Sequence, residues 1–584
     1  MKNKIKYKRS AIITLASSLF ILIALNIIFS FFYVRIDLTA EKRNSLAPST
    51  KKLLKELPDK IFIKVFLLGK NNPADYQIFA QKTKEILEEF VRHSSNIEFE
   101  MIDPIEGKKQ EEVTSIFDEF DNKGLYPIPI SREDLSTTWV VPGAFLTYRA
   151  KEYPVTLVVA DPNGRDWLDF SIQELEYNLV SAIRNITTTD APKVAFLEGH
   201  GEFDKMNTSW MEWQLKRYYA VERVTINNKI NALRNIYVKD STEATIGNFG
   251  NKYDMLIVAQ PTQPFSDMDK YVIDQFIMNG GKVLWLIDAT NASLDSLQNK
   301  MEIFATENEL RLNSLFFKYG VRLNANLIQD INCQYLPIPQ GMIGNQPQYQ
   351  FYAFPYMPVV VNFTSHPIVR KIKALKVDFA GTIDFVGNNP DIQKTVLATT
   401  SERTKVVPVP SIVTLNVIKT RPNIEEYQRM YEPVAVLLEG KFSSAFKGIL
   451  PVAFDTIKEF DFKTECKEIT RQIFISDGDM IRNYYDSKSM QPYPPGYDFY
   501  AKKLYENEDF LLNCVNYLSA DEDLVMIRSK SFKIGTLDPL VVKAKKNFYI
   551  LLNTIGPLII ISIMAAVLIF IRKGKYNQKM KLLP

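Results

Sequence analysis

The chain has 584 residues, 46% of them hydrophobic and 24% charged, a composition typical of a folded protein without long disordered stretches. Two or three domains are expected at this length. The formal net charge is +4, but five bases lie in the first ten residues and five in the last thirteen, with no acid in either segment. The body between them carries 61 Lys and Arg against 67 Asp and Glu, which excludes a nucleic-acid-binding protein.

Two uncharged apolar runs lie next to the basic ends. Ala11–Val34 and Phe548–Ile571 are each 24 residues long, and about 20 suffice to span a bilayer, so both are predicted transmembrane helices. A cleaved signal peptide is the alternative for the first run, but its apolar region is too long and no small-residue cleavage site follows. The positive-inside rule places residues 1–10 and 572–584 in the cytoplasm and about 500 residues between them outside, in the periplasm of a bacterium.

Sequence motifs for catalysis are missing. No serine lies in a G-x-S-x-G motif, and no Gly-rich loop ends in G-K-[S/T], so neither a serine hydrolase nor an ATPase is predicted. Three cysteines without C-x-x-C or metal-ligand spacing are predicted to be buried thiols. Three histidines are too few for a histidine-based metal centre. We therefore expect no enzyme activity, no cofactor and no metal.

The first predicted periplasmic domain spans residues 35–190. Its elements follow the order strand, helix, strand, helix, strand, strand, helix, which is typical of a thioredoxin-like α/β domain. They are expected at Lys60–Leu68, Ala74–His93, Ile97–Met101, Gln110–Asp121, Ala144–Arg149, Pro154–Val159 and Ile172–Ile186. A redox-active domain of this kind has C-x-x-C after its first strand, where this chain reads GKNNPAD. The domain is therefore predicted to lack redox activity.

The second predicted domain spans residues 191–540 and is organised around KVAFLEGHGE, Lys193–Glu202. Some fifty residues later, Tyr253–Asp288 reads strand, Pro-marked loop, amphipathic helix, Gly-Gly stop and strand. Continuous apolar strands joined by a helical crossover are typical of a parallel sheet, so a doubly wound α/β domain is predicted. Further strands are expected at Val221–Ile226, Thr395–Thr399, Val434–Leu438 and Gln472–Ser476, and a closing helix at Glu508–Leu518.

Residues 329–362 form a predicted insertion in this domain. The segment is rich in Gln, Pro, Tyr and Gly, and it is too long for an ordinary connection between elements. It is predicted to be either a functional loop or a packed crossover.

Ligands of open α/β sheets bind beyond the carboxyl ends of the strands, where the strand order reverses. The candidate ligand-binding residues at that edge are Gly199, His200, Gly201, Glu202, Asp288, Asp477 and Asp479. In a structural alternative, the glycines allow a sharp turn while His200 and Glu202 hydrogen-bond the loop. Asp477 and Asp479 fit the start of a helix, where they would cap backbone N–H groups, or an acidic metal site.

Several stretches along the whole chain together resemble one family. They are RIDLTAEKRNSLAPST after the first apolar run, WVVPGAFLTYR, IQELEYNLVSAIRNI, GHGE, KYGVRLNANLIQDINCQYLPIP, TSHPI, VAVLLEGKFSSAF and ISDGDMIRN. In these motifs the chain resembles the gliding-motility-associated ABC transporter auxiliary proteins of Bacteroidota, the GldG family. The second domain is similar to glutamine-amidotransferase-like folds, but no cysteine occupies the turn that holds their nucleophile.

The resemblance implies a non-enzymatic subunit of an ABC-type complex in the bacterial inner membrane. Its implied partners are a GldF-like permease and a cytoplasmic GldA-like ATPase, and its implied role is to couple or scaffold them. Such proteins are also labelled substrate-binding. The alternative is therefore a periplasmic ligand-binding module with a pocket at the carboxyl ends of the strands.

Overall fold

The protein is described by a computed structural model. The described residues are 45–69, 72–131, 137–158, 167–188, 191–235, 250–343, 346–419, 422–448, 462–485, 492–499, 501–519 and 553–570, with the single positions 17, 20, 21, 527, 550 and 573. The chain divides into two units, residues 1–531 and residues 532–584. The predicted span Ala11–Val34 lies outside the described residues apart from three isolated positions.

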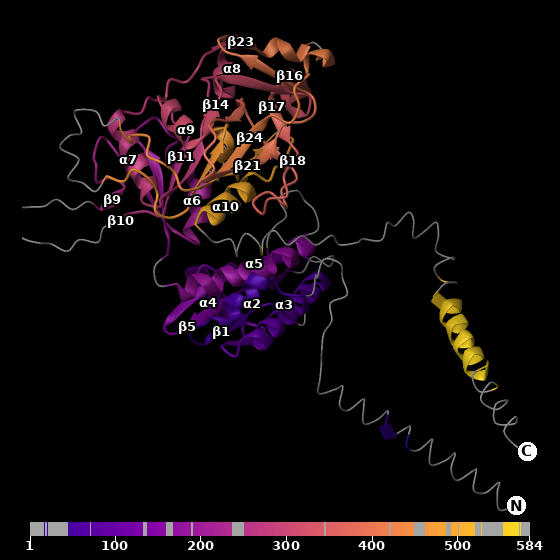
Figure 1. The fold of residues 1–584 in the computed structure, drawn as a ribbon. Coiled ribbons are helices and arrows are strands. Elements are labelled where there is room, and N and C mark those ends of the chain that lie inside the picture. Colours follow the sequence, from indigo (N-terminus) through magenta and orange to yellow (C-terminus); the bar gives the residue numbers. More distant parts are fainter. Residues whose placement is uncertain are drawn as a thin grey trace, which may run out of the picture. The chain divides into compact units, whose positions relative to one another are not determined.

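A four-stranded sheet with the order β2-β1-β5-β6 forms in the N-terminal region (Figure 1). Its strands are β1 (Ile61–Val65), β2 (Ile97–Met101), β5 (Gly143–Tyr148) and β6 (Lys151–Thr156). Strands β1 and β2 run parallel and the other two pairs antiparallel. The accompanying elements are α2 (Pro48–Lys55), α3 (Ala74–His93), α4 (Gln110–Asn122), α5 (Trp167–Thr187) and the hairpin β3 (Ile128–Ser131) and β4 (Thr137–Val140). The strands and helices predicted here are present, although α5 begins five residues earlier than expected.

An eight-stranded sheet with the order β18-β21-β24-β25-β12-β11-β7-β8 follows. Its strands are β7 (Lys193–Glu198), β8 (Ala220–Thr225), β11 (Met255–Ala259), β12 (Lys282–Leu286), β18 (Asn362–Phe363), β21 (Ile392–Thr399), β24 (Pro433–Gly440) and β25 (Thr470–Ile475). The five neighbouring strands β8, β7, β11, β12 and β25 run parallel to one another. The remaining neighbouring pairs, β25–β24, β24–β21 and β21–β18, are antiparallel. Numbered along the chain, the parallel strands run 2-1-3-4-5, so the order reverses between β7 and β11.

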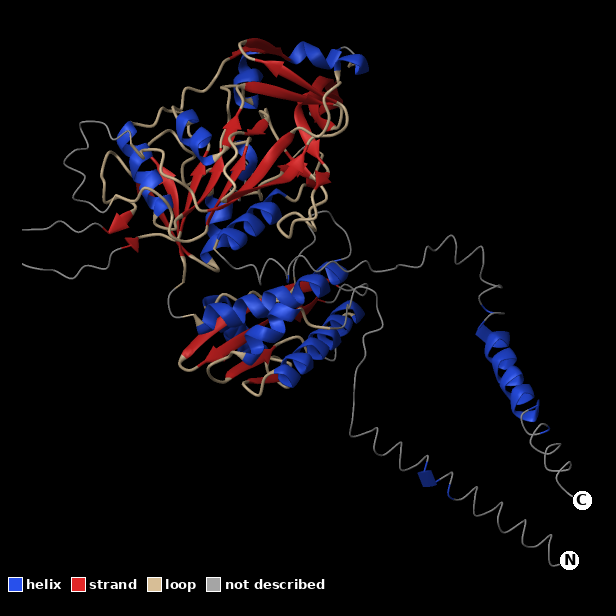
Figure 2. Ribbon diagram, in the orientation of Figure 1, coloured by secondary structure: helices blue, strands red, loops and turns tan. Residues whose placement is uncertain are grey.

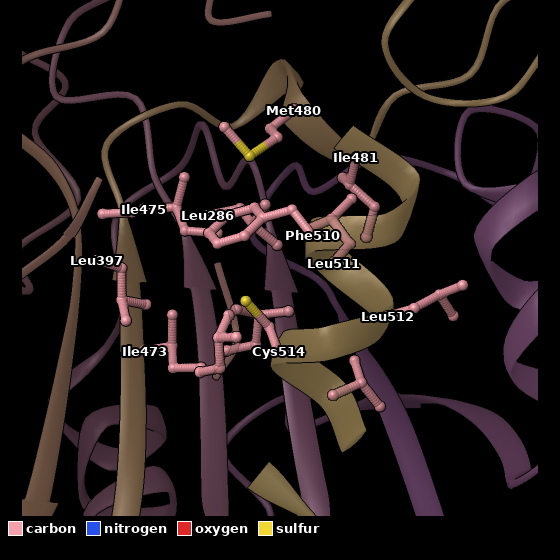
Figure 3. Close-up of a cluster of buried hydrophobic side chains, with 14 of the residues drawn as sticks. Leu286, Leu397, Ile473, Ile475, Met480, Ile481, Phe510, Leu511, Leu512 and Cys514 are labelled. Carbon is pink, nitrogen blue, oxygen red and sulfur yellow. The ribbon is translucent and has the colours of Figure 1, made fainter. Parts of the chain in front are cut away.

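Helices cover both faces of this sheet (Figure 2). One face packs on α6 (Ser209–Lys216) and α10 (Asn507–Leu518), and the other on α7 (Asp267–Met278) and α9 (Asn313–Tyr319). Strand β11 is buried at all five positions, which explains its uninterrupted apolar sequence. Figure 3 shows side chains of α10 packed over the strands, with Phe510 and Leu511 close to Leu286 and Ile475.

Shorter elements surround the large sheet. They are β9 (Arg234–Asn235), β10 (Gly250–Asn251), α8 (Leu294–Lys300), β13 (Glu302–Ala305), β14 (Val321–Leu323), β15 (Asn326–Asp330), β16 (Cys333–Ile343), β17 (Gln346–Val360), β19 (Leu375–Lys376), β20 (Ile383–Phe385), β22 (Thr404–Pro408), β23 (Ser411–Thr414), η1 (Leu415–Lys419), η2 (Ile424–Glu426), η4 (Asp479–Ile481), β26 (Tyr497–Asp498) and β27 (Lys503–Leu504). Within the predicted insertion 329–362, β16 and β17 pair as a long antiparallel hairpin. Its high proline and glutamine content concealed a strand-like alternation of polar and apolar residues.

One described helix, Asn553–Phe570, is long and apolar enough to cross a membrane. It has 18 residues with a mean hydropathy of 2.2, and none of this stretch is buried. At 1.5 Å per residue it extends about 27 Å, close to the hydrocarbon thickness of a bilayer. It lies within the second predicted span.

Two adjacent phenylalanines of α9 provide a matched test of the core. Phe316 is 2% exposed and packs edge-on against Trp285, with ring centroids 4.9 Å apart, whereas Phe317 is 61% exposed. Phe316→Ala should lower the free energy of unfolding by about 3–5 kcal/mol because it leaves a cavity. Phe317→Ala should change it by less than about 0.5 kcal/mol. Urea unfolding of the detergent-solubilised chain measures both, and equal losses would contradict this description of the core.

Candidate functional site

The GHGE turn follows β7 at the point where the strand order reverses. Gly199 and Gly201 have φ angles of +114° and +76°, a backbone region that favours glycine. A Cβ atom on Gly201 would lie 2.1 Å from Thr262 Oγ1, so this turn also needs a residue without a side chain. The carbonyl oxygen of His200 accepts hydrogen bonds from the backbone N–H groups of Thr262 and Gln263, at 2.9 and 2.8 Å. The loops after β7 and β11 are therefore bonded directly to each other.

The His200 side chain is enclosed and bonded at both nitrogens. It is stacked on the Phe265 ring, with centroids 3.8 Å apart and an interplanar angle of 8°. Its Nδ1 lies 3.2 Å from Glu202 Oε1 and its Nε2 lies 3.1 Å from Asp269 Oδ2. The residue as a whole is 4% exposed. Both ring nitrogens can donate at once only in the imidazolium form.

The protonation of His200 fits this arrangement. Burial by itself would lower its pKa, but the hydrogen bonds to Glu202 and Asp269 outweigh burial and raise the pKa above the usual 6.5. Glu202 also accepts a hydrogen bond from the backbone N–H of His200, at 2.7 Å. Asp269 also accepts one from the backbone N–H of Asn228, at 2.8 Å. The imidazole ring thus joins the turn after β7 to the first turn of α7.

A second cluster of buried acids lies at the ends of β12 and β25. Asp288 accepts hydrogen bonds from the backbone N–H of Gly478, at 2.6 Å, and from Gln260 Nε2, at 2.7 Å. Asp477 accepts one from the backbone N–H of Asp479, at 2.9 Å, and one from that of Asp378, at 3.0 Å. Because Gln260 belongs to the loop after β11, a single chain of contacts connects the ends of β7, β11, β12 and β25.

Protonation limits the negative charge of this cluster. Burial, followed by the charge of Asp479, raises the pKa of Asp288 to about 8. Burial also raises the pKa of Asp477 well above its usual range and that of Asp479 to about 6. Near neutral pH, Asp288 is therefore held mainly as a neutral acid, and burial favours the neutral form of Asp477 as well.

Two cations balance the remaining charge of the cluster. Lys376 Nζ lies 3.1 Å from Asp378 Oδ2, and Arg482 Nη1 lies 3.5 Å from Asp479 Oδ1. Burial by itself would lower the pKa of Lys376, but the charge of Asp378 outweighs burial and raises it. Charges removed from water are tolerated only when they are paired in this way.

The chemistry open to these clusters is limited. Within the described part of the chain, no group of three or more His, Cys, Asp or Glu side chains is arranged to hold a metal ion. A hollow beside β12, lined by Ile287, Asn308 and Phe316 among others, has room for about one water molecule. The acids at these strand ends are hydrogen-bonded to the protein's own groups.

The cysteines are buried, as predicted. Cys333, Cys466 and Cys514 are free thiols, and each is buried. Burial raises the pKa of Cys333 to about 12 and that of Cys466 to about 11, and it raises the pKa of Cys514 as well. A reactive thiolate is therefore not available at these positions near neutral pH.

All seven candidate residues from the sequence lie at the carboxyl-terminal edge of the large sheet, but they form two clusters instead of one. Gly199–Glu202 belong to the turn after β7, and Asp288, Asp477 and Asp479 to the second cluster. Sequence reasoning missed the partners Asp269, Lys376, Asp378 and Arg482. A signal existed for Asp269 alone, because it follows the helix cap Ser266 by three residues.

We call the contacts of the His200 ring with Glu202 and Asp269 the His200 clamp. The variant His200→Phe tests it. Phenylalanine can retain the stacking on Phe265 but leaves the buried Glu202 and Asp269 carboxylates without their ring partner, which should cost about 3–5 kcal/mol of unfolding free energy. Because the folded pKa of His200 is raised, the loss should be largest below pH 6.5 and shrink as the pH rises through the folded value. Urea unfolding at several pH values measures this, with the partly exposed His93→Phe as the control. A loss no larger than that of the control would refute the clamp.

The acid cluster makes a separate prediction about pH. Because the pKa of Asp288 is raised from 3.8 to about 8, the folded protein holds a proton that the unfolded chain releases, and stability falls as the pH rises through this window. Asn cannot ionise, so Asp288→Asn should gain stability relative to wild type by up to about 1.4 kcal/mol per pH unit. The exposed Asp391→Asn should leave the slope unchanged. If the unfolding free energies of wild type and Asp288→Asn changed with pH at the same slope, Asp288 would not be the group that holds the proton.

Comparison with known proteins shows the family to which the chain belongs. The model of a family described as an ABC-type uncharacterized transport system matches residues 191–514, more than half of the chain, and a domain of unknown function matches residues 40–147. No curated protein matches significantly. A solved structure titled "mmIFT52 N-terminal domain" aligns with 56% of this chain and 97% of its own, at 12% identity and a TM-score of 0.31, too low to carry an argument. On the match to residues 191–514, the chain belongs to the ABC-type transport auxiliary family.

Proposed function

We propose that this chain is a membrane-anchored, non-catalytic subunit that couples or scaffolds an ABC-type transport complex associated with bacterial gliding motility. Its partners would be a GldF-like permease and a cytoplasmic GldA-like ATPase. The observation that carries the proposal is the family match over residues 191–514, the part of the chain that contains the eight-stranded sheet. The GldG-like motifs found from one end of the sequence to the other support the more specific assignment.

The hydrogen bonds between the loops at the strand ends favour a coupling role over ligand binding. A solute-binding site at the reversal of strand order needs an open crevice between the loops after the first and third strands. Here the loop after β11 donates two backbone hydrogen bonds to the His200 carbonyl, and Gln260 in the same loop donates to Asp288. The candidate residues thus act as internal braces.

We also propose a more specific fold for each of the two domains. A thioredoxin-like domain is supported by the strand order β2-β1-β5-β6 with β1 and β2 parallel. A doubly wound, amidotransferase-like domain is supported by the parallel strands in the order 2-1-3-4-5 with helices on both faces. We place the boundary between the two domains near residue 190, in front of β7.

We further propose that the chain spans the inner membrane twice, with residues 1–10 and 572–584 in the cytoplasm and the main body in the periplasm. The helix Asn553–Phe570 supports the second span. The 24-residue uncharged run Ala11–Val34 and the basic residues before it support the first.

The test is purification of the full-length chain from its native membrane in mild detergent, followed by mass spectrometry. We expect a multi-span permease and an ATPase at a fixed ratio to the chain, and recovery of the chain without them would overturn the proposal. Asp288→Asn is the matched variant. A coupling subunit should retain both partners and gliding when this buried acid is made permanently neutral, whereas loss of gliding with the complex intact would favour the ligand-binding alternative.

A further inference from the structure

The β16–β17 hairpin has an alternating sequence that implies a buried face. From Gln346 to Phe351 the chain reads QPQYQF, with a polar amide at every second position. Alternation of this kind is typical of a strand with one face in water and one face against protein. Nearer the base of the hairpin, the even-numbered face is the buried one, because Leu336 and Phe354 pack into a core cluster with Tyr356.

The odd-numbered face of the hairpin is apolar but exposed; we call it the aromatic–proline face. Across the two strands its pairs are Tyr335 with Ala353, Pro337 with Phe351 and Pro339 with Tyr349. The exposed fractions are 58% for Tyr335, 46% for Phe351 and 44% for Tyr349. Within the described part of the chain, the rings of Tyr335 and Phe351 therefore remain largely open to solvent.

The chemistry of the hairpin restricts what can cover it. The 28 residues from Cys333 to Val360 include no Asp, Glu, Lys, Arg or His, in a chain that is 24% charged. An anionic surface such as a nucleic acid or acidic lipid headgroups is therefore not complementary to it. Aromatic enrichment combined with loss of charge is the composition of the core of a protein–protein interface.

The prolines exclude the simplest pairing with a second strand. Strand β16 is at the edge of its sheet, in the order β16-β17-β19. Pro337 and Pro339 are two residues apart, so their missing N–H groups lie on the same side of the strand. In a paired strand, proline occupies the positions whose N–H would face away from the neighbour. The open edge therefore lacks two donors and does not favour strand addition, including addition of the same hairpin from a second copy.

The size of the face also argues against an independent dimer. Three cross-strand pairs cover on the order of 200–300 Å² at ordinary strand spacings. A stable interface between free proteins buries about 800 Å² on each partner. The face is sufficient only where other contacts already hold the partner close, as they do for two subunits anchored in one membrane complex.

We propose that the aromatic–proline face docks onto an uncharged, apolar periplasmic surface of the permease subunit. The inference rests on the proposed function, because the permease is the partner that the family assignment supplies on the periplasmic side. The face itself is identified by its exposure, its alternation and its lack of charge. Tyr335 and Phe351 are its central anchors.

The first test compares two double variants of the full-length chain. Tyr335→Ser with Phe351→Ser removes the anchors, and Gln348→Ser with Gln350→Ser alters the exposed opposite face. The anchor variant should reduce co-purification of the permease about tenfold, a loss typical of removing interface hot spots. The glutamine variant should recover it at the wild-type level, and the melting temperatures of both should match wild type. Equal permease recovery in the two variants would overturn the inference.

The second test identifies the occupant directly. A photo-crosslinking residue, p-benzoylphenylalanine, replaces Phe351 in one full-length variant and Gln350 in its control, and both are irradiated in native membranes. We expect an adduct with the permease from position 351 and none from position 350. An adduct with a second copy of the chain, or with lipid, would overturn the assignment of the occupant.

The two proposals fail in distinguishable ways. If the wild-type chain recovers no permease, the transporter-subunit function falls and the docking assignment falls with it. If the wild-type chain recovers the permease and the anchor variant recovers as much, with no adduct from position 351, the docking inference falls alone.

Discussion

The carboxyl-terminal edge of the eight-stranded sheet depends on hydrogen bonds between buried polar groups. Parallel strands leave loops at one edge whose backbone N–H and carbonyl groups need partners, and an enzyme of this architecture fills part of that edge with its ligand. In this chain, His200 and Asp288 of the protein itself provide the hydrogen-bond partners at that edge. The carbonyl of His200 takes two backbone donors from the loop after β11, and Asp288 takes the N–H of Gly478 after β25. Each of these groups would be costly to bury without its partners.

This bracing has a mechanical consequence. The ends of four parallel strands are tied to one another and, through Asp269, to the first turn of α7. Asp477 extends the ties to the segment after β19 through the N–H of Asp378. Such hydrogen bonds restrict the relative motion of the loops at this edge, as the proposed coupling role requires.

Local sequence patterns predicted most helices and strands, but they did not predict which distant side chains contact the candidate site. The apolar runs at Met255–Ala259 and Val434–Leu438 identified strands because a fully buried strand has no polar face to interrupt it. The GHGE turn was recognisable because its glycines require positive φ angles. The hairpin of residues 333–360 was not recognised as strand, because proline is depleted in strands and five prolines obscure the alternation.

The failures at the candidate site have a common cause. Sequence placed His200 and Asp288 at one edge of the sheet, which follows from the shared direction of parallel strands. It could not provide Asp269, 69 residues from His200, or Asp378, 99 residues from Asp477, because nothing local distinguishes an acid that will be buried from one that stays in water. Whether the edge was an open pocket or a closed brace depended on those partners. The functional surface that we propose is therefore the aromatic–proline face of the hairpin, where Tyr335 and Phe351 are exposed among the described residues.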